Sequence, residues 1–252
     1  MTDGRFNVLA SVDRQIRLGG LPPAARLDHP GPPPGPSPVP VPVLIPGSDP
    51  VSDSVRGTVP IADGRGELVA RFEAEATALA VTVQRVRGDA AAIDAVIGFL
   101  RERTATRVLA WDAEWLNCPG LAPAIASAGV TLESCWMPSD PEARRLRLAE
   151  LDPVPVGLTG AVAGLADTGS LAVISAPGRG RMASLLPPAH IAVLRAEQIV
   201  PSLPHFLASH PDAADAGSNL VFITGPSRTG DIEMTLSRGV HGPGVVHVVV
   251  IE

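Results

Sequence analysis

The polar residues best able to do chemistry are concentrated between two apolar runs near the end of the sequence. The runs cover residues 220–223 and 245–251, and the segment between them is rich in Gly, Pro, Ser, Thr, Asp, Glu and His. Short runs rich in β-branched residues are typical of strands buried on both faces. Because open α/β sheets bind ligands beyond the ends of their strands, this segment is predicted to carry the functional site.

The first part of this segment, residues 225–230, has the composition of an anion-binding loop. Backbone N–H groups in a glycine-rich turn, together with hydroxyl and guanidinium groups, can hold a phosphate or a carboxylate. A short helix is expected to begin in residues 231–236. Alternatively, a hydroxyl caps the turn and Asp231 pairs with a neighbouring arginine. The candidate ligand-binding residues here are Gly225, Ser227, Arg228 and Thr229.

Three residues further along are candidates for catalysis. Glu233 and Asp231 could each act as a general base or as a carboxylate nucleophile. Alternatively, both hold backbone amides and fix the loop. His241 lies between glycines that permit close backbone approach, and it could relay a proton near neutral pH.

Two glycine-containing turns elsewhere could contribute to the same site. Thr168 and Gly169 belong to a predicted hairpin turn in which the glycine supplies a positive φ. Arg179 lies in a glycine-rich loop and could clamp a carboxylate or phosphate from a second side, or it could lie in a solvated turn. The loops that contain Thr168, Gly225 and His241 are expected to converge at one end of the sheet.

The histidines and cysteines do not form a recognisable metal motif. His190, His241 and His247 are 51 and 6 residues apart, which matches no compact ligand spacing, so no metal is expected. Cys118 and Cys135 are too few for a four-cysteine iron–sulfur cluster and are interpreted as reduced thiols.

The sequence also resembles a known family. The tract from Gly225 to Glu233, GPSRTGDIE, is followed by GVHGP at residues 239–243, and ADTGSL at 166–171 and LLPPAHI at 185–191 precede them in the same order. These motifs are similar to those of the LUD-domain family, lactate-utilisation protein C, over residues 67–252. The resemblance implies an α/β fold with a mainly parallel sheet and an added antiparallel element, like the sugar-phosphate isomerase and CoA-transferase (NagB/RpiA/CoA transferase) fold.

The resemblance further implies a subunit of a bacterial system that oxidises L-lactate to pyruvate. Iron–sulfur clusters are then expected in partner subunits, and no cofactor is expected in this chain. Its own role would be ligand binding or assembly. The alternatives are a stand-alone enzyme acting on a phosphorylated sugar, an acyl-CoA or a folate-type ligand, and a pure scaffold.

The amino-acid composition narrows the possible partners and the possible chemistry of the protein. The net charge of −6 argues against nucleic acids and anionic membranes as general partners. All 20 basic residues are arginines, so Schiff-base chemistry and a phosphate-loop lysine are excluded. No run of 18 apolar residues and no signal-peptide pattern is present, so a cytoplasmic protein is expected.

Hydrophobic spacing and proline content divide the chain into three parts. Residues 1–20 have the spacing of an amphipathic helix, and residues 21–66 form a proline-rich strap or linker because proline lacks the N–H donor of helices and ladders. Residues 67–252 alternate helical and strand patterns, which predicts βαβ crossovers. Within them, a single strand is expected at 157–166, a helix at 197–209, and a helix capped by Asp89.

Overall fold

The structure, a computed structural model, describes residues 64–230, 236–238 and 242–252. The predicted N-terminal helix and residues 21–63 of the strap lie outside the described residues. In the described part the first helix, α2, begins at Arg65. The helices are α2 (Arg65–Ala78), α3 (Gly88–Glu102), α4 (Leu121–Ser127), α5 (Pro141–Leu151) and α6 (Leu203–Ser209).

The main sheet has six strands, and every neighbouring pair is parallel. Its order is β1-β12-β7-β4-β2-β3, so the last strand of the chain lies between the first strand and the centre. The strands are β1 (Thr82–Val86), β2 (Arg107–Ala110), β3 (Thr131–Ser134), β4 (Val156–Gly160), β7 (Ala189–Arg195) and β12 (Val245–Ile251).

A second, four-stranded sheet supplies the antiparallel element, in the order β8-β5-β6-β9. Its strands are β5 (Ala163–Leu165), β6 (Ser170–Ser175), β8 (Ile199–Val200) and β9 (Asn219–Ile223). Strand β6 pairs antiparallel with both β5 and β9, and β8 pairs parallel with β5. The expected combination of a mainly parallel sheet with an added antiparallel element is therefore confirmed.

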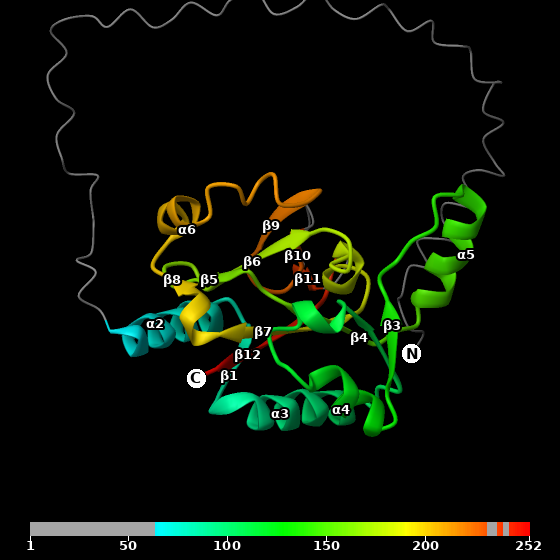
Figure 1. The fold of residues 1–252 in the computed structure, drawn as a ribbon, viewed down its shortest axis with the longest axis horizontal. Coiled ribbons are helices and arrows are strands. Elements are labelled where there is room, and N and C mark those ends of the chain that lie inside the picture. The colour runs from blue at the N-terminus through cyan, green and yellow to red at the C-terminus, as the bar shows by residue number, and fades with distance from the viewer. Residues whose placement is uncertain (1–63, 231–235, 239–241) are drawn as a thin grey trace, which may run out of the picture. The chain divides into compact units, whose positions relative to one another are not determined.

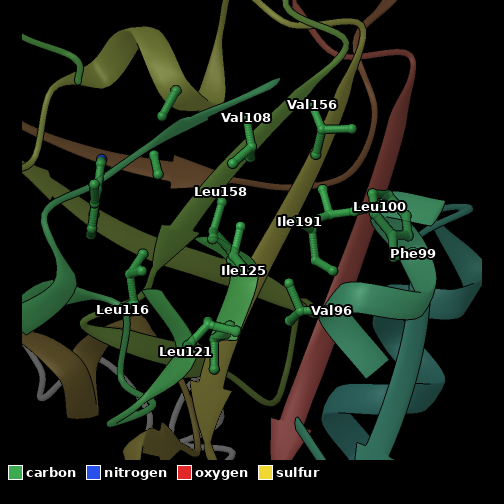
Figure 2. Close-up of a cluster of buried hydrophobic side chains, with 14 of the residues drawn as sticks. Val96, Phe99, Leu100, Val108, Leu116, Leu121, Ile125, Val156, Leu158 and Ile191 are labelled. Atoms are coloured by element: carbon green, nitrogen blue, oxygen red, sulfur yellow. The ribbon is translucent and has the colours of Figure 1, made fainter. Parts of the chain in front are cut away.

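Apolar side chains pack in three layers, of which the first two lie against the main sheet and the third packs α6 against the four-stranded sheet. Helices α3 and α4 cover one face of the main sheet, and the four-stranded sheet lies on the other side (Figure 1). Figure 2 shows the first layer, in which Val96 and Leu100 of α3 and Leu121 and Ile125 of α4 meet the strand residues. The second layer includes every other residue of β12 and β7. These residues face the opposite side of the sheet because successive side chains of a strand point in opposite directions.

Three sequence-based expectations about elements were wrong. Residues 157–166 form two strands in different sheets, because the carbonyl of Ala161 accepts side-chain hydrogen bonds from Asn117 and Gln198 where β4 ends. Residues 197–209 form a short 3₁₀ turn η4 (Ala196–Gln198), strand β8 and helix α6, with Pro201 between the last two. Asp89 does not cap α3 but pairs with Arg195 at 2.7 Å.

A side-chain cap fixes the start of α5. Asp140 caps α5 by accepting a hydrogen bond of 2.8 Å from the Ala143 backbone N–H, with Pro141 in the first turn. Within the described residues, no helix is long and apolar enough to cross a membrane.

Candidate functional site

Two of the predicted site glycines lie against the C-terminal end of helix α2. Gly169, at φ +62°, closes the β5–β6 hairpin, and a Cβ atom at this position would lie 2.2 Å from the backbone nitrogen of Ala76. Gly225, at φ +95°, follows β9, and its Cβ would lie 3.1 Å from the carbonyl oxygen of Leu79. The hairpin turn and the start of the 225–230 loop are therefore neighbours, as the sequence predicted.

Hydrogen bonds tie the two loops together and join them to the chain before β12. The hydroxyl groups of Ser170 and Thr224 lie 2.8 Å apart. The backbone N–H of Ser227 donates to the carbonyl of Pro243 at 2.9 Å. This N–H is consequently engaged, whereas the Ser227 hydroxyl has no hydrogen bond within the described residues and could contact a ligand.

This loop cluster lies at the amino-terminal edge of the main sheet. Pro243 precedes β12, and the backbone N–H of Gly244 donates at 3.0 Å to the carbonyl of Pro188, which precedes the neighbouring strand β7. The apolar runs 220–223 and 245–251 belong to different sheets, because the first lies in β9 of the four-stranded sheet and the second forms β12 of the main sheet. Strand β9 is only partly buried. The expectation of two strands of one sheet, each buried on both faces, was therefore wrong for β9.

The rest of the 225–230 loop forms one side of a small hairpin. Strand β10 (Arg228–Gly230) pairs antiparallel with β11 (Leu236–Arg238), so Leu236 is not part of the expected short helix. The candidate catalytic residues Asp231, Glu233 and His241 lie outside the described residues. Their roles stay predictions.

Arg179 is not close to this cluster in the fold. Thr168 and Gly169 precede the first residue of β6, whereas Arg179 follows its last residue, so the six residues of the strand separate them. The expected clamp from a second side of the same site was therefore wrong. Arg179 instead places its guanidinium 4.1 Å from the ring centre of Trp115.

The guanidinium of Arg179 has no hydrogen bond or ion pair within the described residues, and its Nε atom is buried. Burial lowers the pKa of this arginine from its usual value, because loss of solvent disfavours the charged guanidinium. A buried donor without an acceptor is uncommon and requires an explanation such as a bound water or ligand.

The two described histidines among the metal candidates lie on opposite faces of the main sheet. His190 is fully buried, with Nε2 2.9 Å from the Thr159 hydroxyl, and burial lowers its pKa to about 4. His247 packs edge-on against Phe99 of α3 and borders a cleft of about 400 Å³ between α3 and β1. Within the described residues no cluster of His, Cys, Asp and Glu could hold a metal ion.

A cleft of about 460 Å³ lies at the carboxyl edge of the main sheet, and no sequence motif indicated it. It is bordered by residues that follow β2 and β3 and by the loop after β6. The lining residues are Asp112, Ser134, Cys135, Trp136, Ala176, Pro177, Gly178 and Gly180. This is the edge at which α/β sheets bind their ligands.

Close packing of the loop over the strand ends shapes this cleft. A Cβ atom on Gly180 would lie 2.4 Å from the Cβ of Cys135, and one on Gly178 would lie 2.8 Å from Oδ2 of Asp112. The backbone N–H of Asp112 donates to the Gly178 carbonyl at 2.8 Å, and the Trp111 indole donates to the Gly180 carbonyl at 3.1 Å.

Cys135 forms part of the wall of the cleft. Burial raises the pKa of its thiol to about 12, with a smaller contribution in the same direction from the Asp112 carboxylate, so the thiol is protonated at neutral pH. Cys135 and Cys118 are both free thiols. The exposed Trp136 ring, 68% accessible, lies at the same cleft.

Comparison with a solved structure supports the class of fold. The chain is an α/β protein, and its structure is similar to the crystal structure of a DUF162 family protein from Deinococcus radiodurans, with a TM-score of 0.53 and 23% identity. That match covers 75% of this chain and 99% of the other. The LUD domain family model matches residues 69–251, and the chain belongs to this family.

Several curated relatives carry a functional name. The chain is 32% identical over 192 residues to lactate utilization protein C of an Exiguobacterium species, covering 73% of this chain and 78% of the relative. It is also 32% identical over 163 residues to lactate utilization protein C of Halalkalibacterium halodurans, covering 63% and 68%.

Proposed function

We propose that this protein acts in the utilisation of L-lactate, as a ligand-binding or assembly component beside iron–sulfur subunits that oxidise lactate to pyruvate. The observation that carries this proposal is the 32% identity to lactate utilization protein C over 192 residues, because it spans 78% of that relative rather than one motif.

A role beside redox subunits, rather than as the redox subunit, agrees with the chemistry of this chain. Its two cysteines are Cys118, which is buried, and Cys135, whose thiol is protonated at neutral pH. Four thiolates are the usual ligands of an iron–sulfur cluster. The clusters are therefore assigned to partner subunits.

The 225–230 loop is proposed as an anion-binding loop of this component. The loop follows strand β9, and Gly225 adopts a positive φ. The Ser227 hydroxyl makes no hydrogen bond within the described residues. Its proximity to the β5–β6 hairpin supports a single cluster of ligand-contacting residues, for which phosphate or carboxylate is the fitting class of ligand.

Affinity purification of the full chain from the organism that encodes it, followed by iron analysis and L-lactate oxidation assays, tests this role. We expect iron–sulfur proteins to co-purify and lactate oxidation to require them, while the isolated chain has no turnover. Turnover of a sugar phosphate or acyl-CoA by the isolated chain, without any iron-containing partner, would instead indicate a stand-alone enzyme.

A further inference from the structure

The ends of two neighbouring strands bring an acidic and an aromatic side chain to the cleft at the carboxyl edge of the main sheet. Ala110 of β2 is paired in parallel register with Ser134 of β3, and Asp112 and Trp136 each follow two residues later. Asp112, Ser134 and Trp136 all line the cleft. These three groups therefore share one space, at the edge where α/β sheets bind their ligands.

The carboxylate of Asp112 is available to a ligand. Asp112 precedes the 3₁₀ turn η2 (Ala113–Trp115), a position where aspartate commonly accepts a backbone N–H, but its side chain makes no such bond. Its Oδ2 lies over Gly178 instead, since a Cβ atom on that glycine would be 2.8 Å from it. Within the described residues the carboxylate has no hydrogen bond or ion pair, so both of its oxygens can accept from a ligand.

Ser134 supplies a hydrogen-bond donor beside this carboxylate. Its Oγ accepts the backbone N–H of Trp136 at 3.1 Å, and within the described residues its own proton has no acceptor. A hydroxyl that accepts one hydrogen bond can still donate another. The side chains of Asp112 and Ser134 thus offer a ligand two acceptors and one donor.

The other lining residues offer flat and apolar surface. The Trp136 ring is 68% exposed, which is a large fraction for a tryptophan. Ala176 and Pro177 add apolar surface from the loop after β6, and the Cys135 thiol is directed to the Ala110 carbonyl at 3.3 Å. An exposed aromatic ring in a cleft of about 460 Å³ is suited to stacking on a flat ligand ring.

Charge and hydrogen-bonding pattern then select the kind of ring. Asp112 is the one charged side chain among the residues that line the cleft, and it would repel a negatively charged ligand group. A carboxylate accepts two parallel N–H groups in a bidentate pair. We propose that the cleft binds a flat ring with a 2-amino-4-oxopyrimidine edge, the arrangement found in guanine and in pterins. The ring stacks on Trp136, its ring N–H and amino group donate to Asp112, and its oxo group accepts from Ser134.

Other ligands match these groups less well. Adenine has an acceptor nitrogen beside its amino group, so it would place a lone pair against one carboxylate oxygen. Hypoxanthine has the ring N–H and the oxo group but lacks the amino group. An organic cation would pair with Asp112 and leave the Ser134 hydroxyl unused. This assignment rests on the lining groups alone and does not depend on the proposed role in lactate utilisation.

Calorimetric titration of the full chain with guanosine, pterin, adenosine and choline tests the proposal, with inosine and lumazine as the matched rings that lack the amino group. Guanosine, pterin or both should bind, and the tighter of the two identifies the source of the ring. Inosine should bind about tenfold to a hundredfold more weakly than guanosine, and lumazine than pterin, because one charge-assisted hydrogen bond is lost.

Three results of these titrations would overturn the proposal. They are adenosine binding as tightly as guanosine and pterin, binding of choline alone, and no binding of either guanosine or pterin at about 1 mM.

Two variants locate the binding in this cleft. Asp112→Ala should abolish the preference for guanosine over inosine and for pterin over lumazine, because the carboxylate is what recognises the amino group. Trp136→Ala should weaken every ring that binds by about tenfold, through loss of stacking. The matched controls Glu114→Gln and Leu146→Ala change exposed residues that do not line the cleft, and they should bind as the native chain does.

Both variants should fold, because the side chains of Asp112 and Trp136 are exposed, and thermal unfolding checks this. An unchanged preference for the amino-bearing rings in folded Asp112→Ala would show that they bind elsewhere and would contradict the site.

Discussion

Gly169 and Ala76 lie so close that no side chain can stand between them. The hairpin turn of Gly169 packs directly on the backbone of helix α2, with 2.2 Å between the position of an added Cβ and the Ala76 nitrogen. The family motif around residue 169 therefore has a structural reason: it seats the β5–β6 hairpin on α2 and so places the 225–230 loop beside it.

Gly169→Ala should destabilise the protein by about 2–4 kcal/mol, from overpacking and from the left-handed backbone that alanine disfavours. Thermal or urea unfolding measures this. Gly66→Ala, a change in helix α2 with no atom within 4 Å of the new Cβ, is the matched control and should be neutral or stabilising by about 0.5–1 kcal/mol. Equal stabilities of the two variants would show that the contact does not matter.

Ser227→Ala combined with Arg228→Ala should weaken phosphate or carboxylate binding at the 225–230 loop. Loss of a charge-assisted contact costs about 1.5–3 kcal/mol, or roughly tenfold to a hundredfold in affinity. Calorimetric titration with phosphate, in parallel with Glu233→Gln, separates binding from catalysis. Glu233→Gln should keep or improve phosphate affinity, because it removes a negative charge. Unaltered phosphate binding in the double variant would show that the anion does not bind at this loop.

His190 should make the fold less stable in mild acid. Its folded pKa of about 4 lies below the ordinary value of 6.5, because burial disfavours the imidazolium. Below pH 6.5 the unfolded chain binds a proton that the folded chain does not, so this contribution is present above pH 6.5 and is lost as the pH falls towards 4, at up to about 1.4 kcal/mol per pH unit.

Urea unfolding of the native chain and of His190→Gln between pH 4 and 8 measures this dependence. The difference in stability between the two proteins should shrink as the pH falls. A constant difference would mean that His190 is protonated in the folded state or is not buried.

Removal of residues 1–60 should leave the α/β domain folded, since the truncation removes no residue of the described sheets, helices or apolar layers. Circular dichroism and a cooperative thermal transition are the measurements. A truncated chain that is unfolded would show that the proline-rich segment is part of the core.

Local sequence signals predicted much of the fold. The β-branched run 245–251 is β12, and the turn at Gly169 closes a hairpin. These features depend on residues close in the sequence. By contrast, Val221 pairs with Val173 of β6, 48 positions earlier, and no local pattern shows that pairing or the assignment of β9 to a different sheet from β12.

The candidate site was predictable only in part, for the same reason. Gly169 and Arg179 both lie in glycine-containing loops, but the two loops are at opposite ends of β6, so they cannot form one site. The carboxyl-edge cleft is assembled from three separate segments, around Asp112, Trp136 and Gly178.

Growth on L-lactate tests the central claim most directly. The gene for this chain would replace the lactate utilization protein C gene in the related Exiguobacterium species, with growth on glucose and the amount of folded protein as controls. The proposed function predicts that growth on L-lactate as the sole carbon source is restored. Normal growth on glucose and normal protein levels, with no growth on L-lactate, would contradict it.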